Sequence, residues 1–396
     1  MSRPLDPIPP TRNVSIDCLR TALTLMVVAH HSSLAYTSFA HFDSSNYLAS
    51  TAPVVDNSRW LVLDYAQNFN DIFFMSLMFF VSGLFVWPSL QRHGVKGFLR
   101  ERALRLGLPF VFFVSTLMPL AYYGSWQLTG NDSGYLDYWI NRYFFAHGWP
   151  PGPLWFIWML LLFDCIVALL GIRFLKEWNS LKAMHDFAKN HPLPIFMSMF
   201  ILGVFLHLPL LAEFNNIWVP LGSTPFYFQL SRIGLYFAWF VFGTFIGTAQ
   251  IENGLLAEEG LLAKNWRWWT IFTIIAFGLL YAIPYLLNAN NLLSSNGRGI
   301  VWIYLWVLSC TASCFGFLAL FRGNAQTRRM WMDSLSRSAY IIYIVHYVFV
   351  VWIQRALMEQ PLHAGIKFVT VFALSVLLSW ITAQVLLRIP GAARVL

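Results

Sequence analysis

The chain has 396 residues, of which 58% are hydrophobic, 18% aromatic and only 11% charged, and its mean hydropathy is +0.57. Because soluble domains carry about 25% charged residues, this composition excludes a soluble enzyme and indicates a polytopic membrane protein. The net charge of +8 does not indicate a nucleic-acid partner, since the basic residues are spread over short loops between apolar segments, the pattern of membrane topology.

We predict an all-α integral membrane protein with about ten transmembrane helices, each near the ~20 residues that cross a bilayer. The first apolar segment follows a short Pro-rich tail, residues 1–13, and has no small-residue cleavage site, so we expect it to remain as a signal anchor. One transmembrane domain should cover residues 14–390, followed by a short tail at 391–396. The predicted spans are residues 16–37, the second half of 60–87, 108–123, 154–174, 193–211, 225–247, 270–287, 300–321, 338–352 and beyond, and 366–387.

The distribution of Lys and Arg predicts that both termini are cytoplasmic. With that orientation, 20 of the 26 basic residues fall in cytoplasmic segments. The connecting segments are short, so we expect any chemistry to lie among the helices. The six basic residues on the outer side are Arg59, Arg142, Arg232, Arg298, Arg355 and Lys367.

The first span carries ionisable residues at both ends. Arg20 and His31 are eleven residues apart, which is about three helical turns plus ~20° and roughly 16 Å along one face. Asp17 precedes Arg20 by three residues and can pair with it, whereas His30 lies about 80° off that face and should meet lipid or a neighbouring helix. Such groups usually face a protein interior or a water-filled cavity. The alternative is that Arg20 anchors the helix at the headgroups and His31 is a structural polar residue.

A basic loop precedes the third span. Arg102 and Arg105 are three residues apart on one helical face, and Arg100 lies just before them. Guanidinium groups bind oxyanions with two parallel donors, so this loop suits a phosphate-bearing ligand. The alternative is positive-inside anchoring through contacts with lipid headgroups.

Two further pairs of polar or small residues lie inside spans. Tyr343 precedes His346 by three residues on nearly one face, and the two are interpreted equally well as site residues or as a structural histidine with its partner. Ser82 and Gly83 interrupt an apolar segment, where close helix packing is favoured over a nucleophilic serine.

Aromatic residues and cysteines carry weaker signals. Trp155 and Trp158 at the outer end of the fourth span suit an aromatic belt, although a Trp face is also a stacking surface for sugars. Asp164, His207 and Arg232 are other polar groups in or near spans. The cysteines have no metal-ligand spacing with His, so we expect neither a disulfide nor a metal site; they are Cys18, Cys165, Cys310 and Cys314.

Taken together, the motifs resemble those of membrane-bound acyltransferase family 3. The likeness extends from about residue 14 to residue 390, and within the family it is greatest to members that have ten spans and no fused soluble domain. The motifs, in chain order, are Arg, ten residues and His at 20–31; Phe-Phe-x-Ser-Gly at 79–83; Arg-x-x-Arg-x-x-x-Pro at 102–109; Leu-Trp-Phe at 154–156; and Ser-x-Tyr-x-x-Tyr-x-x-His at 338–346.

The resemblance implies an enzyme of the bacterial inner membrane. It would take an acetyl or succinyl group from cytoplasmic acetyl-CoA or succinyl-CoA and place it on a hydroxyl of an extracytoplasmic glycan. The phosphates of the acyl-CoA would meet Arg102 and Arg105, and Arg20, held by Asp17, would position the donor or stabilise charge. His31 suits a general base, because an unperturbed imidazole has a pKa of about 6.5.

Two questions stay open at this point. Transfer could be direct or could pass through a covalent intermediate on Tyr343, His346 or Ser82. A non-enzymatic transporter or exporter of a glycan is the alternative function, although such proteins more often show inverted repeats, and the sequence shows none.

Overall fold

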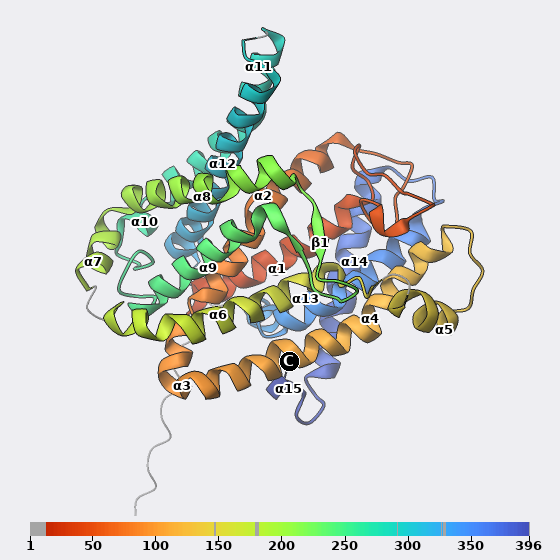
Figure 1. Cartoon of the computed structure of the whole chain (residues 1–396), viewed down its shortest axis with the longest axis horizontal. Coiled ribbons are helices and arrows are strands. Elements are labelled where there is room, and N and C mark those ends of the chain that lie inside the picture. The colour runs from red at the N-terminus through yellow and green to blue at the C-terminus, as the bar shows by residue number, and fades with distance from the viewer. Residues whose placement is uncertain are drawn as a thin grey trace, which may run out of the picture.

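The computed structural model describes residues 13–145, 148–178, 182–290, 292–325, 327 and 330–395. Within these ranges the protein is a helical bundle with one small hairpin of two strands (Figure 1). The predicted N-terminal tail lies outside the described residues except for Asn13. The long helices are α1 Val14–Leu34, α2 Leu61–Gly83, α3 Val86–Arg102, α4 Leu108–Gln127, α6 Trp155–Trp178, α8 Pro192–Phe214, α9 Ile233–Thr248, α11 Trp266–Ala289, α12 Ser295–Asn324, α13 Met330–Leu357 and α14 Ala364–Leu386.

Short elements connect these helices. Antiparallel strands β1 and β2 form the hairpin, with Val219 opposite Phe228. Helices α11 and α12 pack along each other, and the connection between them projects from the rest of the bundle (Figure 1). The short elements are η1 Tyr47–Ala49, η2 Ala103–Gly107, α5 Tyr135–Asp137, η3 Tyr138–Phe144, η4 Gly152–Leu154, α7 Lys182–Asn190, β1 Trp218–Pro220, β2 Tyr227–Gln229, η5 Leu230–Arg232, α10 Leu261–Lys264 and α15 Ala392–Val395.

In the described part of the chain, eight segments are long and apolar enough to cross a membrane. They coincide with the last eight of the ten predicted spans, so the protein is a multi-pass helical membrane protein. The first two predicted spans are also helices, α1 with 21 residues and α2 with 23. Because they contain more polar side chains, they are less apolar than the eight segments. The count of ten and the cytoplasmic position of both termini stay predictions.

Helix α1 lies inside the bundle, in contact with α2, α12, α13 and α14. Its start is specified locally, because the Asn13 side chain accepts a hydrogen bond of 3.1 Å from the amide of Ile16, the usual role of an N-cap asparagine. Leu19, Leu23 and Val28 are fully buried along its length. Helix α1, which carries several ionisable side chains, is therefore enclosed by other helices rather than by lipid. Ionisable groups within a membrane usually have such surroundings.

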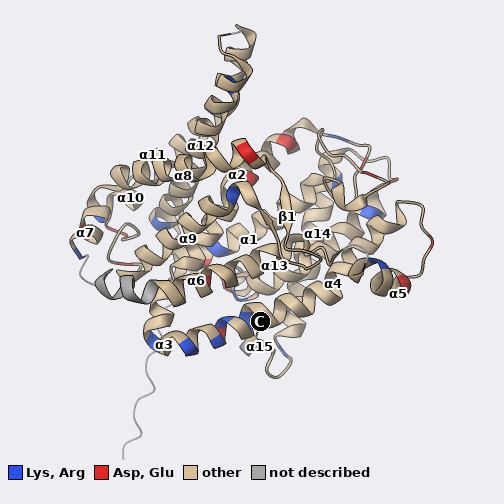
Figure 2. Ribbon diagram, viewed as in Figure 1, with Lys and Arg blue, Asp and Glu red and all other residues tan. Residues whose placement is uncertain are grey.

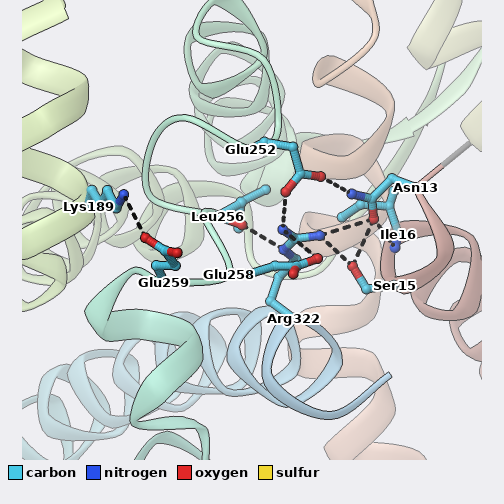
Figure 3. Close-up of polar contacts among 9 residues, drawn as sticks. All are labelled: Asn13, Ser15, Ile16, Lys189, Glu252, Leu256, Glu258, Glu259 and Arg322. Carbon is cyan, nitrogen blue, oxygen red and sulfur yellow. Dashed lines mark hydrogen bonds and ion pairs between the residues drawn. The ribbon is translucent and has the colours of Figure 1, made fainter. Parts of the chain in front are cut away.

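The face at which α1 begins is held together by a buried arginine (Figure 3). The guanidinium of Arg322 in α12 is 1% exposed and donates to the carbonyl of Leu256 at 2.6 Å, to Ser15 Oγ at 2.8 Å and to Asn13 Oδ1 at 3.1 Å. It also pairs with Glu252 at 2.9 Å. One side chain thus ties together α12, the segment 249–260 and the first turn of α1.

The face at which α1 ends is held by a second buried charge. Lys367 in α14 pairs with Asp56 at 2.6 Å, and both side chains are 2% exposed. The backbone of Asp56 donates to the carbonyl of Ala35, which follows α1, and Arg59 donates to the carbonyls of Ala35 and Thr37. Segment 35–60 is therefore fastened across the end of α1, so both ends of this helix are anchored.

Helices α2 and α9 cross at unusually close range. A Cβ atom on Gly243 would lie 2.0 Å from the carbonyl oxygen of Phe80, and one on Gly83 would lie 2.3 Å from the carbonyl oxygen of Phe240. Ser82 donates to the carbonyl of Met78 in its own helix at 2.8 Å. The packing interpretation of Ser82 and Gly83 is confirmed, since small residues permit backbones to approach in membrane helices.

We expect Gly243→Ala to separate α2 from α9 and to destabilise the protein by about 3 kcal/mol, because the added methyl meets backbone that cannot rotate away. Gly278→Ala in α11 is the matched control, since a Cβ there meets nothing within 4 Å. The measurement is the thermal midpoint of each purified variant in detergent. Equal midpoints for the two variants would contradict the close crossing.

Candidate active site

Helices α1 and α13 bring two of the predicted site residues together. The rings of His31 and His346 have centroids 5.3 Å apart, and Tyr347 lies 5.1 Å from His31. His346 is fully buried, whereas His31 is half-buried. Tyr343, one turn before His346, donates its hydroxyl hydrogen to the carbonyl of Pro153 in η4, the turn that precedes α6. The two histidine motifs, far apart in the sequence, thus form one cluster.

Hydrogen bonding specifies which nitrogen of His346 can accept a proton. Its Nδ1 lies 2.6 Å from the carbonyl oxygen of Tyr343, and a carbonyl can only accept, so Nδ1 carries the hydrogen and Nε2 carries the lone pair. Among the described residues, neither His346 Nε2 nor His31 Nδ1 has a hydrogen-bond partner, although both are buried. The same holds for Nδ1 of the neighbouring His30. Buried polar atoms are nearly always paired, so three such atoms close together indicate a site for a reactant.

Gln354 in α13 holds the end of α1 on which His31 lies. Its Nε2 donates to the carbonyl of His31 at 3.0 Å and to that of Ser32 at 3.3 Å. These carbonyls belong to the last turn, where a helix leaves acceptors without amide donors. Gln354 therefore orients the backbone that carries His31, a role that the sequence did not predict.

His30 points toward a neighbouring helix, one of the two surroundings predicted for it. Its ring stacks on Phe74 of α2 with centroids 5.2 Å apart, and its Nε2 lies 3.5 Å from Nε2 of Gln67. The ring is also 5.2 Å from that of His31. His30 thus packs against α2, whereas His31 faces α13.

Arg20 and Asp17 lie at the opposite end of α1 from the histidine cluster. Their side chains form the predicted pair, with Arg20 Nη1 3.9 Å from Asp17 Oδ1, and Arg20 stays 44% exposed. The structure therefore keeps this guanidinium accessible at the face where α1 begins, about three turns from His31.

The three arginines predicted to bind phosphates have different surroundings. Arg102 Nε lies 3.2 Å from the carboxylate of Asp164, which is 1% exposed, so Arg102 also stabilises the packing of α3 on α6. Arg105 pairs with Glu101 at 3.4 Å and is 54% exposed, and Arg100 is exposed. The pair with Asp164 was not predicted, because the two residues lie in different predicted elements. Basic residues follow one another along α3 (Figure 2).

Arg105 lies within the π-helical turn η2, where the regular hydrogen bonding of the helix is interrupted. The hydroxyl of Tyr340 in α13 donates to the carbonyl of Arg105 at 2.6 Å. π-helical turns within α-helices frequently occur at functional sites. This contact joins the basic loop directly to the helix that carries Tyr343 and His346.

Aromatic residues that the sequence did not single out extend the cluster toward segment 35–60. The ring of Tyr347 lies 6.0 Å from that of Tyr122, and Tyr122 lies 6.3 Å from Tyr47. The hydroxyls of Tyr47 and Tyr138 are hydrogen-bonded at 2.9 Å. The row of phenols leads from His31 toward the face at which α1 ends.

Trp155 and Trp158 contact the small hairpin. Trp158 is 7% exposed and donates to the carbonyl of Tyr227 at 2.9 Å, and Trp155 lies 5.2 Å from Trp218. Trp158 is therefore buried against protein, which does not fit the aromatic-belt interpretation. Trp155 is half-buried beside the start of α6.

The described residues form a membrane-embedded helical bundle in which ionisable groups meet between the helices. Comparison with known families identifies the family of the protein. The family model described as the acyltransferase domain, family 3, matches residues 13–384. The chain belongs to this family and is an acyltransferase, which confirms the resemblance seen in the motifs.

Curated relatives support the same assignment. Glucans biosynthesis protein C of Escherichia coli K12 is 25% identical over 365 residues, which cover 87% of this chain and 83% of the relative. The protein of the same name from Shigella dysenteriae serotype 1 is 25% identical over 360 residues, with the same coverage of both chains. No solved structure matches the chain.

Proposed function

We propose that the protein is a membrane O-acyltransferase that moves an acetyl or succinyl group from cytoplasmic acyl-CoA to a hydroxyl of an extracytoplasmic glycan. Its family and the naming of its relatives for glucan biosynthesis support this function. The observation that carries the proposal is the histidine pair between α1 and α13, with a proton-accepting nitrogen on His346 and an unpartnered buried nitrogen on His31. Nothing specific in the structure favours the exporter.

In the proposed reaction, His31 accepts the proton of a sugar hydroxyl while the hydroxyl oxygen attacks the carbonyl carbon of the thioester. The carbon–sulfur bond then breaks, CoA leaves as the thiolate, and the proton on His31 neutralises that thiolate. His346 lies beside His31, with ring centroids 5.3 Å apart, and the lone pair on its Nε2 is a second proton acceptor in the cluster. This direct transfer needs no covalent intermediate on Tyr343, whose hydroxyl is engaged by Pro153.

The proposed donor route starts at the face where α1 begins, which the charge distribution predicts to be cytoplasmic. Arg100 and Arg105 are exposed, Arg20 is 44% exposed, and Arg102 offers its remaining donors beside Asp164. These guanidinium groups suit the phosphates of acyl-CoA. The acceptor glycan would arrive at the opposite face, through the phenol row, and the bacterial inner membrane is the proposed location.

The test is mass spectrometry of envelope glycans from cells with and without the protein. We expect a glycan species that gains the mass of one acyl group only when the protein is present, and the gain identifies acetyl or succinyl. Unchanged glycan masses, together with movement of unmodified oligosaccharide into vesicles that contain the protein, would instead establish the exporter.

A further inference from the structure

A buried ion pair between α2 and η5 lies outside the chemistry described above. Arg232 Nη2 is 2.7 Å from Asp71 Oδ2, and Arg232 Nη1 donates to the backbone carbonyl of Asp71 at 3.3 Å. The guanidinium is 8% exposed and lies over the ring of Trp306 with its Cζ 4.9 Å from the ring centroid, while the side chain of Asp71 keeps 35% exposure. Arg232 is therefore enclosed, whereas the side chain of Asp71 is partly exposed.

A circuit of side-chain contacts connects this pair to the histidine cluster. Asp71 lies on the same face of α2 as Phe74, three residues later, and Phe74 stacks on His30. On the other side, Tyr236 follows Arg232 by one turn of α9. The successive centroid separations around the circuit are His30–His31 5.2 Å, His31–His346 5.3 Å, His346–Tyr343 6.0 Å, Tyr343–Phe156 5.8 Å, Phe156–Phe79 4.7 Å and Phe79–Tyr236 5.2 Å.

The charges of the pair select the kind of group that Asp71 can bind. A carboxylate, such as the free end of a succinyl group, would be repelled by Asp71, to which Nη1 and Nη2 of Arg232 both donate. A hydroxyl group suits Asp71, because a carboxylate offers about four acceptor sites and the contact with Arg232 uses one oxygen. Trp155, half-buried and stacked on Tyr236 with centroids 5.8 Å apart, adds an apolar surface for the face of a sugar ring.

We propose that Asp71 binds a hydroxyl of the acceptor sugar and thereby places a neighbouring hydroxyl at the histidine pair, with Arg232 as the positioning residue that holds the carboxylate. This subsite rests on the proposed transfer to a glycan. In this proposal, Asp71 helps to determine which acceptor sugar binds. The basic residues on the other face of the membrane bind the acyl-CoA.

The test uses the full chain in lipid nanodiscs with a soluble glucose oligosaccharide as acceptor. We expect Asp71→Asn to raise the KM for the oligosaccharide by about tenfold or more, the usual loss for a hydrogen bond to a charged group, with the KM for acyl-CoA unchanged. Calorimetric binding of the oligosaccharide without acyl-CoA should weaken by the same factor. Asp64→Asn is the control, since this acid of α2 bonds Ser38 and lies outside the circuit.

Because Asp71→Asn leaves Arg232 buried without its counter-charge, a second variant replaces both residues. Asp71→Asn combined with Arg232→Gln removes both charges and should fold, yet it should show the same raised KM for the acceptor. A wild-type acceptor KM in this folded double variant would overturn the subsite alone. Oligosaccharide binding by the unmodified protein without any acyl transfer would instead overturn the proposed function alone.

Discussion

His31→Asn should lower the rate of acyl transfer to the glycan by at least about 100-fold, the lower end of what a general base contributes. Asparagine keeps the approximate size and polarity of the side chain but cannot take up a proton at neutral pH. The backbone contact to Gln354 involves the carbonyl of His31, so the substitution leaves it in place. The measurement is transfer from acyl-CoA in nanodiscs, normalised to protein amount.

His30→Asn is the matched control in the same turn of α1. Its ring packs on Phe74 and contacts Gln67 of α2, so we expect a loss of no more than about tenfold. Both variants should keep the thermal midpoint of the unsubstituted protein within a few degrees. The reverse order of activities would assign the base to His30 and would remove the argument drawn from the pair with His346.

Arg322→Met should destabilise the protein by about 2 to 4 kcal/mol. The substitution removes the donor to the buried carbonyl of Leu256 and the partner of Glu252, and each hydrogen-bonding group that loses its partner costs about 1 to 3 kcal/mol. It also releases the first turn of α1 from the segment that carries Glu252. The expected observation is a lower thermal midpoint in detergent and faster proteolysis near the start of α1.

Arg337→Met in α13 is the control for charge. Arg337 is exposed, and its side chain donates to the carbonyl of Asp333 in its own helix at 3.3 Å. Its removal should change stability by no more than about 0.5 kcal/mol. A midpoint for Arg322→Met as high as that of Arg337→Met would show that the buried network does not anchor α1.

Local sequence was enough to predict the helices and the family. Long apolar segments specify membrane helices because every backbone group in the bilayer must be satisfied within its own segment. Spacing within one helix also predicted the pairing of Asp17 with Arg20, three residues apart, since such neighbours share a helix face. The motifs around Arg20 and His31 identified the acyltransferase family, and the match over residues 13–384 confirmed it.

Contacts between helices could not be predicted in this way. Arg232 drew attention as a charged residue near a span, but its partner Asp71 lies in a helix far away in the sequence. The sequence predicted Arg102 as a phosphate-binding residue and gave no sign of its ion pair with Asp164, which forms where α3 packs on α6. Helical periodicity predicts which residues share a face of one helix. It does not predict which neighbouring helix that face will contact.

Hydropathy and short motifs are properties of local segments, so they were enough to identify a helical membrane protein of an acyltransferase family. The folded arrangement of the helices was needed to show that His31 meets His346, that Gln354 holds the end of α1 and that Asp71 pairs with Arg232. The physical reason is that a buried polar group in a bilayer needs a partner, and the crossing of helices selects that partner.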